Sequence, residues 1–187
     1  MPGLDSQASV GDHARQVARL KLDELYRWSD AVDQPYAVRD LHHLRIAAKR
    51  LRYTLEVFET YLPDGCHAVV KELVEVQEEL GQLHDRDVVI ALLRLCLGSL
   101  EHPLAPQAIT MGVTAQPKPR PFLPSALVLH LINPDGEFSA EHRYGLEQLV
   151  RQQQQKRQKW YSTFRQHWNR LQEQDLRRHL LALLEQG

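Results

Sequence analysis

The apolar residues between Val38 and Leu62 recur at intervals of three and four, which is typical of a helix with one buried face. The residues that form this face are Leu41, Leu44, Ala48, Leu51, Leu55, Phe58 and Leu62. The helix is predicted to span about 38–61, and the same period predicts helices at about 12–32, 66–97, 140–173 and 175–184. Pro35 and the sequence Pro63-Asp64-Gly65 separate the first three helices, since proline and glycine favour turns.

These helices predict an all-α fold, an antiparallel bundle of four long helices followed by a short C-terminal helix. Seven of the ten prolines lie between Pro103 and Pro134, so residues 98–139 are predicted to form a long Pro-rich loop. The length of 187 residues fits a single domain over residues 1–187. Asp12 is the expected N-cap of the first helix, and Lys21 falls in the apolar register of that helix.

A second periodic set of residues lies one position after the apolar set in the 38–61 helix. We call it the cationic row, and its members are His42, Arg45, Lys49 and Arg52. Because a helix turns by about 100° per residue, this row lies directly beside the buried face. No acidic residue occurs between Asp40 and Glu56, so the positive charges stand in a row. A row of cations about one turn apart suits a long polyanion.

The overall charge changes this picture little. The net charge is −1, so any attraction for a polyanion must come from local clustering of cations. Hydrophobic content of 43% and charged content of 25% are typical of a soluble globular protein.

Cys66 and Cys96 form neither a CxxC pair nor a disulfide framework, which favours a reducing compartment. The first residues lack the features of a signal peptide, and the apolar runs are too short to span a bilayer, so we expect a cytoplasmic protein without a membrane partner.

Two segments resemble motifs of a known family. The sequence LHHLRIAAKRLRYTLEVF, from Leu41, and the sequence ELGQLHDRDV, from Glu79, resemble the CHAD (conserved histidine α-helical domain) family in order and spacing. The resemblance is clearest from Leu41 to Leu93, and His42 and His84 match its histidines. It implies an all-helical domain that binds inorganic polyphosphate through basic side chains. We expect binding without catalysis, and neither a cofactor nor a metal ion.

The expected site extends beyond the cationic row. Lys21 and Arg157 are included because each occupies an apolar position of its helix, where a cation either reaches the surface or borders a polar groove. Asp85 could orient His84 or pair with a row arginine, while Tyr53 is expected to pack with its polar tip outward. The residues expected to bind polyphosphate are His42, Arg45, Lys49, Arg50, Arg52, His84, Lys21 and Arg157, and those expected to support them are Tyr53, Asp85 and Arg86.

Other functions remain open. An HD-type metal-dependent phosphohydrolase would recruit His42 or His43, the doublet His84-Asp85, and Asp135 or Asp175. A nucleic-acid partner is not expected, because aromatic residues do not alternate with the basic residues for stacking. A partner-binding bundle could use the Pro-rich loop. The simplest alternative for the row is a solvated cationic face that pairs with glutamates of the next helix.

The number of motif copies raises a further expectation. CHAD domains commonly contain two related halves, whereas this chain shows one clear copy that resembles the second half. We therefore expect two chains to pair about a two-fold axis and rebuild the larger basic surface. A polyphosphate-processing enzyme is a further expected partner, and polyphosphate granules in the cytoplasm are an expected location.

Overall fold

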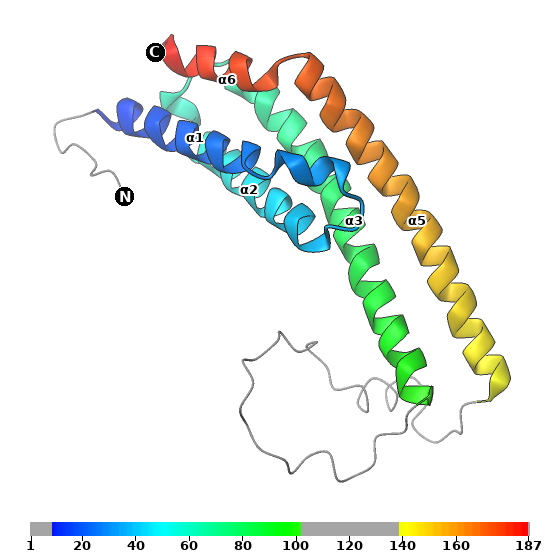
Figure 1. Ribbon diagram of the computed structural model, residues 1–187. Coiled ribbons are helices and arrows are strands. Elements are labelled where there is room, and N and C mark those ends of the chain that lie inside the picture. The colour runs from blue at the N-terminus through cyan, green and yellow to red at the C-terminus, as the bar shows by residue number, and fades with distance from the viewer. Residues whose placement is uncertain (1–8, 102–138, 187) are drawn as a thin grey trace, which may run out of the picture. The chain divides into compact units, whose positions relative to one another are not determined.

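The computed structural model describes residues 9–101 and 139–186. Within these ranges the chain is all-helical, which confirms the predicted class (Figure 1). The helices are α1 (Val10–Tyr26), α2 (Val38–Val57), α3 (Cys66–Glu101), α5 (Ala140–Glu173) and α6 (Leu176–Glu185), with the 3-10 turns η1 (Ser29–Asp33) and η2 (Glu59–Tyr61). None of the described helices is long and apolar enough to cross a lipid bilayer.

The five helices lie where the apolar period predicts them, and they differ from the prediction only in where some of them begin or end. Helix α5 spans the predicted residues, whereas α1 stops at Tyr26 and α2 at Val57, and each continues as a 3-10 turn. Helix α3 runs to Glu101, so residues 98–101 are helical and the predicted loop boundary at 98 was wrong. No proline precedes Pro103 in this stretch, and Gly98 is tolerated inside the helix. The remainder of the predicted loop, 102–138, lies outside the described residues.

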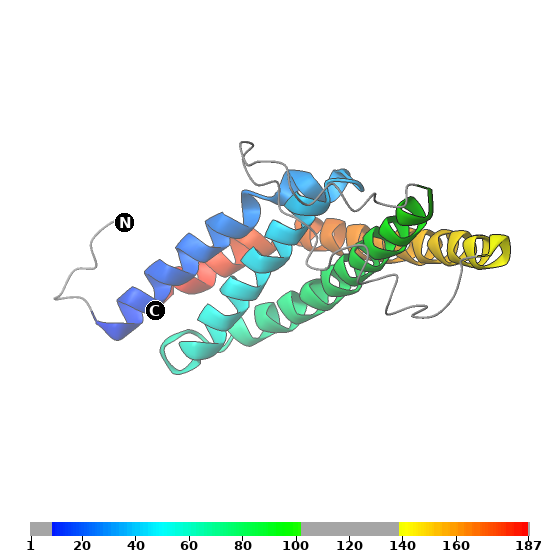
Figure 2. The ribbon, with the colours of Figure 1, turned by 90° about the horizontal axis from the view of Figure 1, so that it is seen from below.

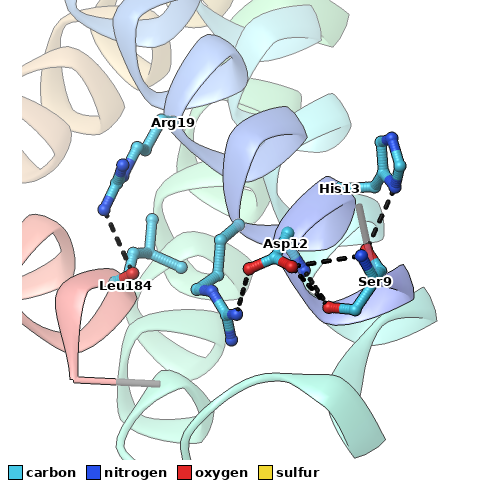
Figure 3. A network of polar contacts seen from close by, with 6 residues as sticks. Ser9, Asp12, His13, Arg19 and Leu184 are labelled. Carbon is cyan, nitrogen blue, oxygen red and sulfur yellow. Dashed lines mark hydrogen bonds and ion pairs between the residues drawn. The ribbon is translucent and has the colours of Figure 1, made fainter. Parts of the chain in front are cut away.

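The start of α1 also differs from the prediction, because Ser9 rather than Asp12 is the N-cap. Figure 3 shows the reciprocal bonds of this capping box: the Asp12 amide donates to the Ser9 hydroxyl, and the Ser9 amide donates to the Asp12 carboxylate, both at 3.1 Å. Hydrogen bonds from the Ser9 hydroxyl and from Arg15 lower the pKa of Asp12 to about 2. The helix therefore begins one turn earlier than the sequence predicted.

The described helices group into two compact units. The first contains the described residues up to Asp85 and from Arg157 onward, and the second spans Arg86–Lys156. The single domain predicted for the whole chain stays a prediction. The first unit has a core drawn from all five helices, which includes Leu22, Leu44, Leu73, Phe164 and Leu184. The second has a small cluster around the buried residues Cys96 and Leu146, with Leu93 and Leu97 packed against them.

In the first unit, α1 lies beside both α2 and α6 (Figure 1 and Figure 2). Arg19 donates to the carbonyl of Leu184 at 3.1 Å, and Arg177 pairs with Asp23 at 2.9 Å. The earlier residue of α1 thus contacts the later residue of α6, and the later residue of α1 contacts the earlier residue of α6, so the two helices run antiparallel. The bond from Arg19, visible in Figure 3, also satisfies a carbonyl in the last turn of α6.

The segment between α1 and α2 is held by side chains of α5. The Tyr161 hydroxyl donates to the Val32 carbonyl at 2.7 Å, and Arg165 pairs with Asp33 at 2.7 Å. Arg157 donates to the carbonyl of Pro35 at 2.6 Å. These contacts fix the point where the chain enters α2, the helix that carries the cationic row.

Candidate functional site

The cationic row lies beside the buried face of α2, as the sequence predicts. Leu41, Leu44, Ala48, Leu51 and Leu55 are buried in the core of the first unit. The row residues His42, Arg45, Lys49 and Arg52 are all half-buried. A side chain in this position has its stem against apolar neighbours while its polar end reaches the surface. The row therefore occupies the edge of the core and not a fully solvated face.

Helix α3 faces the first part of the row. The rings of His42 and His84 lie with their centroids 4.7 Å apart. One turn earlier in α3, a Cβ atom added at Gly81 would lie 3.7 Å from Nε of Arg45. From the first contact to the second, α2 advances from His42 to Arg45 whereas α3 goes back from His84 to Gly81, so the two helices run antiparallel here. Because Gly81 has no side chain, the Arg45 guanidinium has room beside it.

A hollow of about 240 Å³ opens at the start of α2. Its lining residues are Val38, Arg39, His42, His43 and His84. His43 is half-buried and stacks on Trp28 with a centroid distance of 4.5 Å. The hollow therefore brings three imidazole rings together with an arginine.

Several nitrogen atoms in and beside this hollow have no hydrogen-bond partner in the described part of the chain. The Nδ1 atoms of His42, His43 and His84, and Nε of Arg45, are buried without a hydrogen-bond partner among the described residues. Burial lowers the pKa of His42, and the positive charges of His84, Arg45 and His43 lower it further. The hollow thus offers donors to an anion but disfavours positive charge on His42 when no anion is present.

The second part of the row is organised around Tyr53. The Arg52 guanidinium lies 4.5 Å from the centre of the Tyr53 ring, and Nζ of Lys49 lies 5.4 Å from it. Nε of Arg52 also lies 3.5 Å from the Glu56 carboxylate. Tyr53 is exposed, so its ring supports the two cations at the surface through cation–π contacts rather than packing into the core.

Lys21 and Arg50 belong to a different cluster. Both form ion pairs with Glu24 of α1, and the bond from Lys21 is 2.8 Å long. The hydrogen bond from Lys21 lowers the pKa of Glu24, although burial of this carboxylate acts in the opposite direction. The apolar register of α1 includes Leu22, which is fully buried, and Lys21 lies at the edge of the core. These two cations are thus held by an acid between α1 and α2.

The other predicted residues have separate surroundings. Arg157 is only 6% exposed, and its guanidinium bonds the Pro35 carbonyl and lies 5.8 Å from the Tyr36 ring centre. Asp85 is exposed and forms no ion pair with His84 or the row arginines in the described part of the chain. Arg86 is half-buried and belongs to the second unit.

Among the described residues, no carboxylate lines the hollow to complete a metal site with its three histidines. In the described ranges, the group of three ligand-type side chains close enough to hold one ion is Glu72, Glu75 and His167. Asp175 is the N-cap of α6 and pairs with Arg178. Asp135 lies outside the described residues. In the described part of the chain, the histidines of the HD-type alternative are therefore brought together without a carboxylate lining their hollow.

Sequence reasoning missed Arg39 and His43 as lining residues. Arg39 lies three residues before His42 and extends the cationic row by one turn, so the helical period could have included it. His43 is placed by its contact with Trp28, which lies outside α2 and comes from the segment after α1. No spacing in the sequence signals a stacking partner of that kind.

One comparison with known proteins, the scan of family models, agrees with the motif resemblance. No curated protein and no solved structure matches the sequence. The family model of the CHAD domain matches residues 3–94, which include α1, α2, the cationic row and both histidines of the His42–His84 contact. Residues 3–94 of this chain are therefore identified as a match to the CHAD domain family.

Proposed function

We propose that the chain binds inorganic polyphosphate along the cationic row and in the adjoining hollow, without catalysis. The observation that carries this proposal is the set of buried nitrogens on His42, His43, His84 and Arg45 that lack a partner among the described residues. An unpaired buried polar group costs about 1–3 kcal/mol, so such groups are normally bonded. Phosphate oxygens in the hollow would supply the missing acceptors.

A polymer fits the row better than a single phosphate does. From Arg39 to Arg52 the cations extend over about 20 Å, given a rise of about 1.5 Å per residue. One phosphate group can contact only one or two of these side chains, whereas a chain with a charge on every unit can contact them all. Arginine adds directionality, since its planar fork can bond two phosphate oxygens at once.

Polyphosphate binding of this kind is mainly electrostatic and depends on the local cluster of cations. The net charge of the chain is −1, so the field of the whole protein does not attract a polyanion. Each row cation that neutralises a phosphate releases a counterion, and affinity then falls steeply with salt. Lys21 and Arg50, which Glu24 neutralises in part, contribute less than the row.

The remaining expectations belong to the same proposal. They are one antiparallel bundle domain, a cytoplasmic location at polyphosphate granules, and a polyphosphate-processing partner enzyme. They also include pairing of two chains, because one motif copy gives only part of the basic surface that two halves would form. Sedimentation analysis with and without polyphosphate tests this pairing: a strict monomer with full affinity would remove it from the proposal.

The first experiment is retention of purified chain by long-chain polyphosphate, combined with a phosphate-release assay in the presence of Mg²⁺, Mn²⁺ or Zn²⁺. The proposal expects retention and no released phosphate. Metal-dependent release would replace it with the HD-type hydrolase. Absence of retention at low salt would remove polyphosphate as the ligand.

A further inference from the structure

A second group of chemically active side chains lies between α3 and α5 in the first unit. Glu72, Glu75 and Glu79 follow one another at intervals of three and four and so share one face of α3. His167 of α5 projects into this face and is only 7% exposed. Three carboxylates from one helix therefore surround one buried imidazole from another.

Both ring nitrogens of His167 face carboxylate oxygens. Nδ1 lies 2.9 Å from Oε2 of Glu79, and Nε2 lies 3.0 Å from Oε2 of Glu72. Oε2 of Glu75 lies 4.0 Å from the same Nε2. The ligand atoms of Glu72, Glu75 and His167 all lie within 4.8 Å of one another.

We propose that Glu72, Glu75 and His167 bind a divalent transition-metal ion of the zinc type. Zn²⁺ accepts imidazole nitrogen and carboxylate oxygen at about 2.0–2.2 Å, so small side-chain movements would close the group around the ion, and water would complete its coordination. Glu79 acts as the positioning residue. By accepting the Nδ1–H bond, it leaves Nε2 free of hydrogen and directed at the ion, as the carboxylates behind metal-binding histidines do.

The charge of the group favours a dication. Three carboxylates lie around the His167 ring, with Oε2 of Glu79 at Nδ1 and those of Glu72 and Glu75 at Nε2. A guanidinium nitrogen of Arg170 lies 3.6 Å from Oε2 of Glu72. Arg170 offsets one of the three negative charges, and a dication would offset the other two. The carboxylates become more exposed from Glu79 to Glu72 to Glu75, with side-chain values of 14%, 35% and 64%, so an ion could enter from the Glu75 side.

The alternative is an ion-pair network in which protonated His167 and Arg170 serve the glutamates and no metal binds. The two accounts differ in a titration of the full, metal-stripped chain with zinc chloride at neutral pH, followed by calorimetry. The metal site predicts one tightly bound Zn²⁺ per chain and a rise in Tm of roughly 5 °C at saturation. The network predicts neither.

The variant for this test is Glu75→Gln, because Glu75 is the most exposed of the ligands and its loss leaves the core intact. Glu78→Gln is the matched control: Glu78 is exposed on the same helix, accepts a bond from Gln82, and lies outside the proposed ligand set. We expect at least roughly tenfold weaker zinc binding for Glu75→Gln and no change for Glu78→Gln.

Two results would overturn the proposal. One is absence of zinc binding by the unaltered chain. The other is equal zinc binding by the unaltered chain, Glu75→Gln and Glu72→Gln, which would place the ion on other histidines. Far-UV circular dichroism of each variant confirms that the helices are retained. Polyphosphate is left out of these titrations because it chelates metal ions, so the outcome is independent of the proposed function.

Discussion

The imidazole rings of His42 on α2 and His84 on α3 lie 4.7 Å apart, centre to centre, at the edge of the hollow. Positive charge on the His84 ring at this distance disfavours protonation of His42. Burial is the largest cause of the lowered pKa of His42, followed by the charges of His84 and Arg45. A polyanion in the hollow would act in the opposite direction, because it stabilises the protonated ring. The pair therefore connects protonation to anion binding.

The first prediction concerns the stability of the free protein against pH. Because the pKa of folded His42 lies below that of the unfolded chain, the unfolded state takes up the proton first as the pH falls. The His42 contribution to stability is thus present above about pH 6.5 and is lost as the pH falls through the lowered folded pKa. Urea unfolding across this window should show a smaller pH dependence for His42→Gln than for the unaltered chain. Equal pH dependence would show that the folded environment does not perturb this ring.

The second prediction concerns polyphosphate binding against pH, which should have the opposite sign. Affinity should rise as the pH falls from about 7.5 to about 6, since a bound polyanion favours the imidazolium form. Calorimetry in two buffers of different ionisation enthalpy measures the accompanying proton uptake. The double variant His42→Gln with His84→Gln should take up fewer protons. A proton uptake unaffected by these substitutions would assign it to other groups.

The third prediction separates the row from the cations on Glu24. Replacing Arg45 and Arg52 by glutamine removes two charged donors at the site and should weaken polyphosphate binding by roughly tenfold or more for each arginine. The slope of log affinity against log salt should also become shallower by about one for each lost contact. Arg50→Gln, on the same helix but paired with Glu24, is the matched control and should have a smaller effect. An equal loss from Arg50→Gln would move the binding surface away from the row.

The fourth prediction tests the packing of α6. A Cβ atom at Gly65 would lie 2.6 Å from Cδ2 of Leu183 and 3.1 Å from its Cδ1. Gly65→Ala should therefore cost about 1–2 kcal/mol of unfolding free energy, since Leu183 must shift. Gly145→Ala is the control, because nothing lies within 4 Å of a Cβ there and alanine is the better helix former by about 1 kcal/mol. Chemical denaturation should give a lower unfolding free energy for Gly65→Ala than for the unaltered chain, and no such loss for Gly145→Ala. Equal stability of both would contradict the close approach of α6.

The helices and the cationic row follow from the sequence because both depend on one period within one helix. In α1, however, the period alone does not decide which of two adjacent residues is buried. Lys21 and Leu22 both fit the interval from Ala18 to Leu25, and packing places Leu22 in the core. The 3-10 turn at η1 could not be separated from a longer helix, since over four or five residues the periods of 3.0 and 3.6 barely diverge.

The contacts between helices could not be predicted in the same way. Gly81 opposite Arg45 depends on the axial alignment of α2 with α3, which no spacing within either helix determines. The ion pair of Arg50 with Glu24 and the stacking of His43 on Trp28 likewise join different segments of the chain. The sequence could therefore indicate which cations share a face, but not which of them an acid already neutralises.

The most direct test of the account is competition between long-chain polyphosphate and single-stranded DNA for the purified chain over a salt series. We expect tight, salt-sensitive polyphosphate binding that DNA does not displace and that the Arg45 and Arg52 substitutions weaken, with helicity retained. Equal affinity for DNA, or unchanged polyphosphate binding by the substituted chain, would contradict the central claim. The row would then be a general cationic face of the helix.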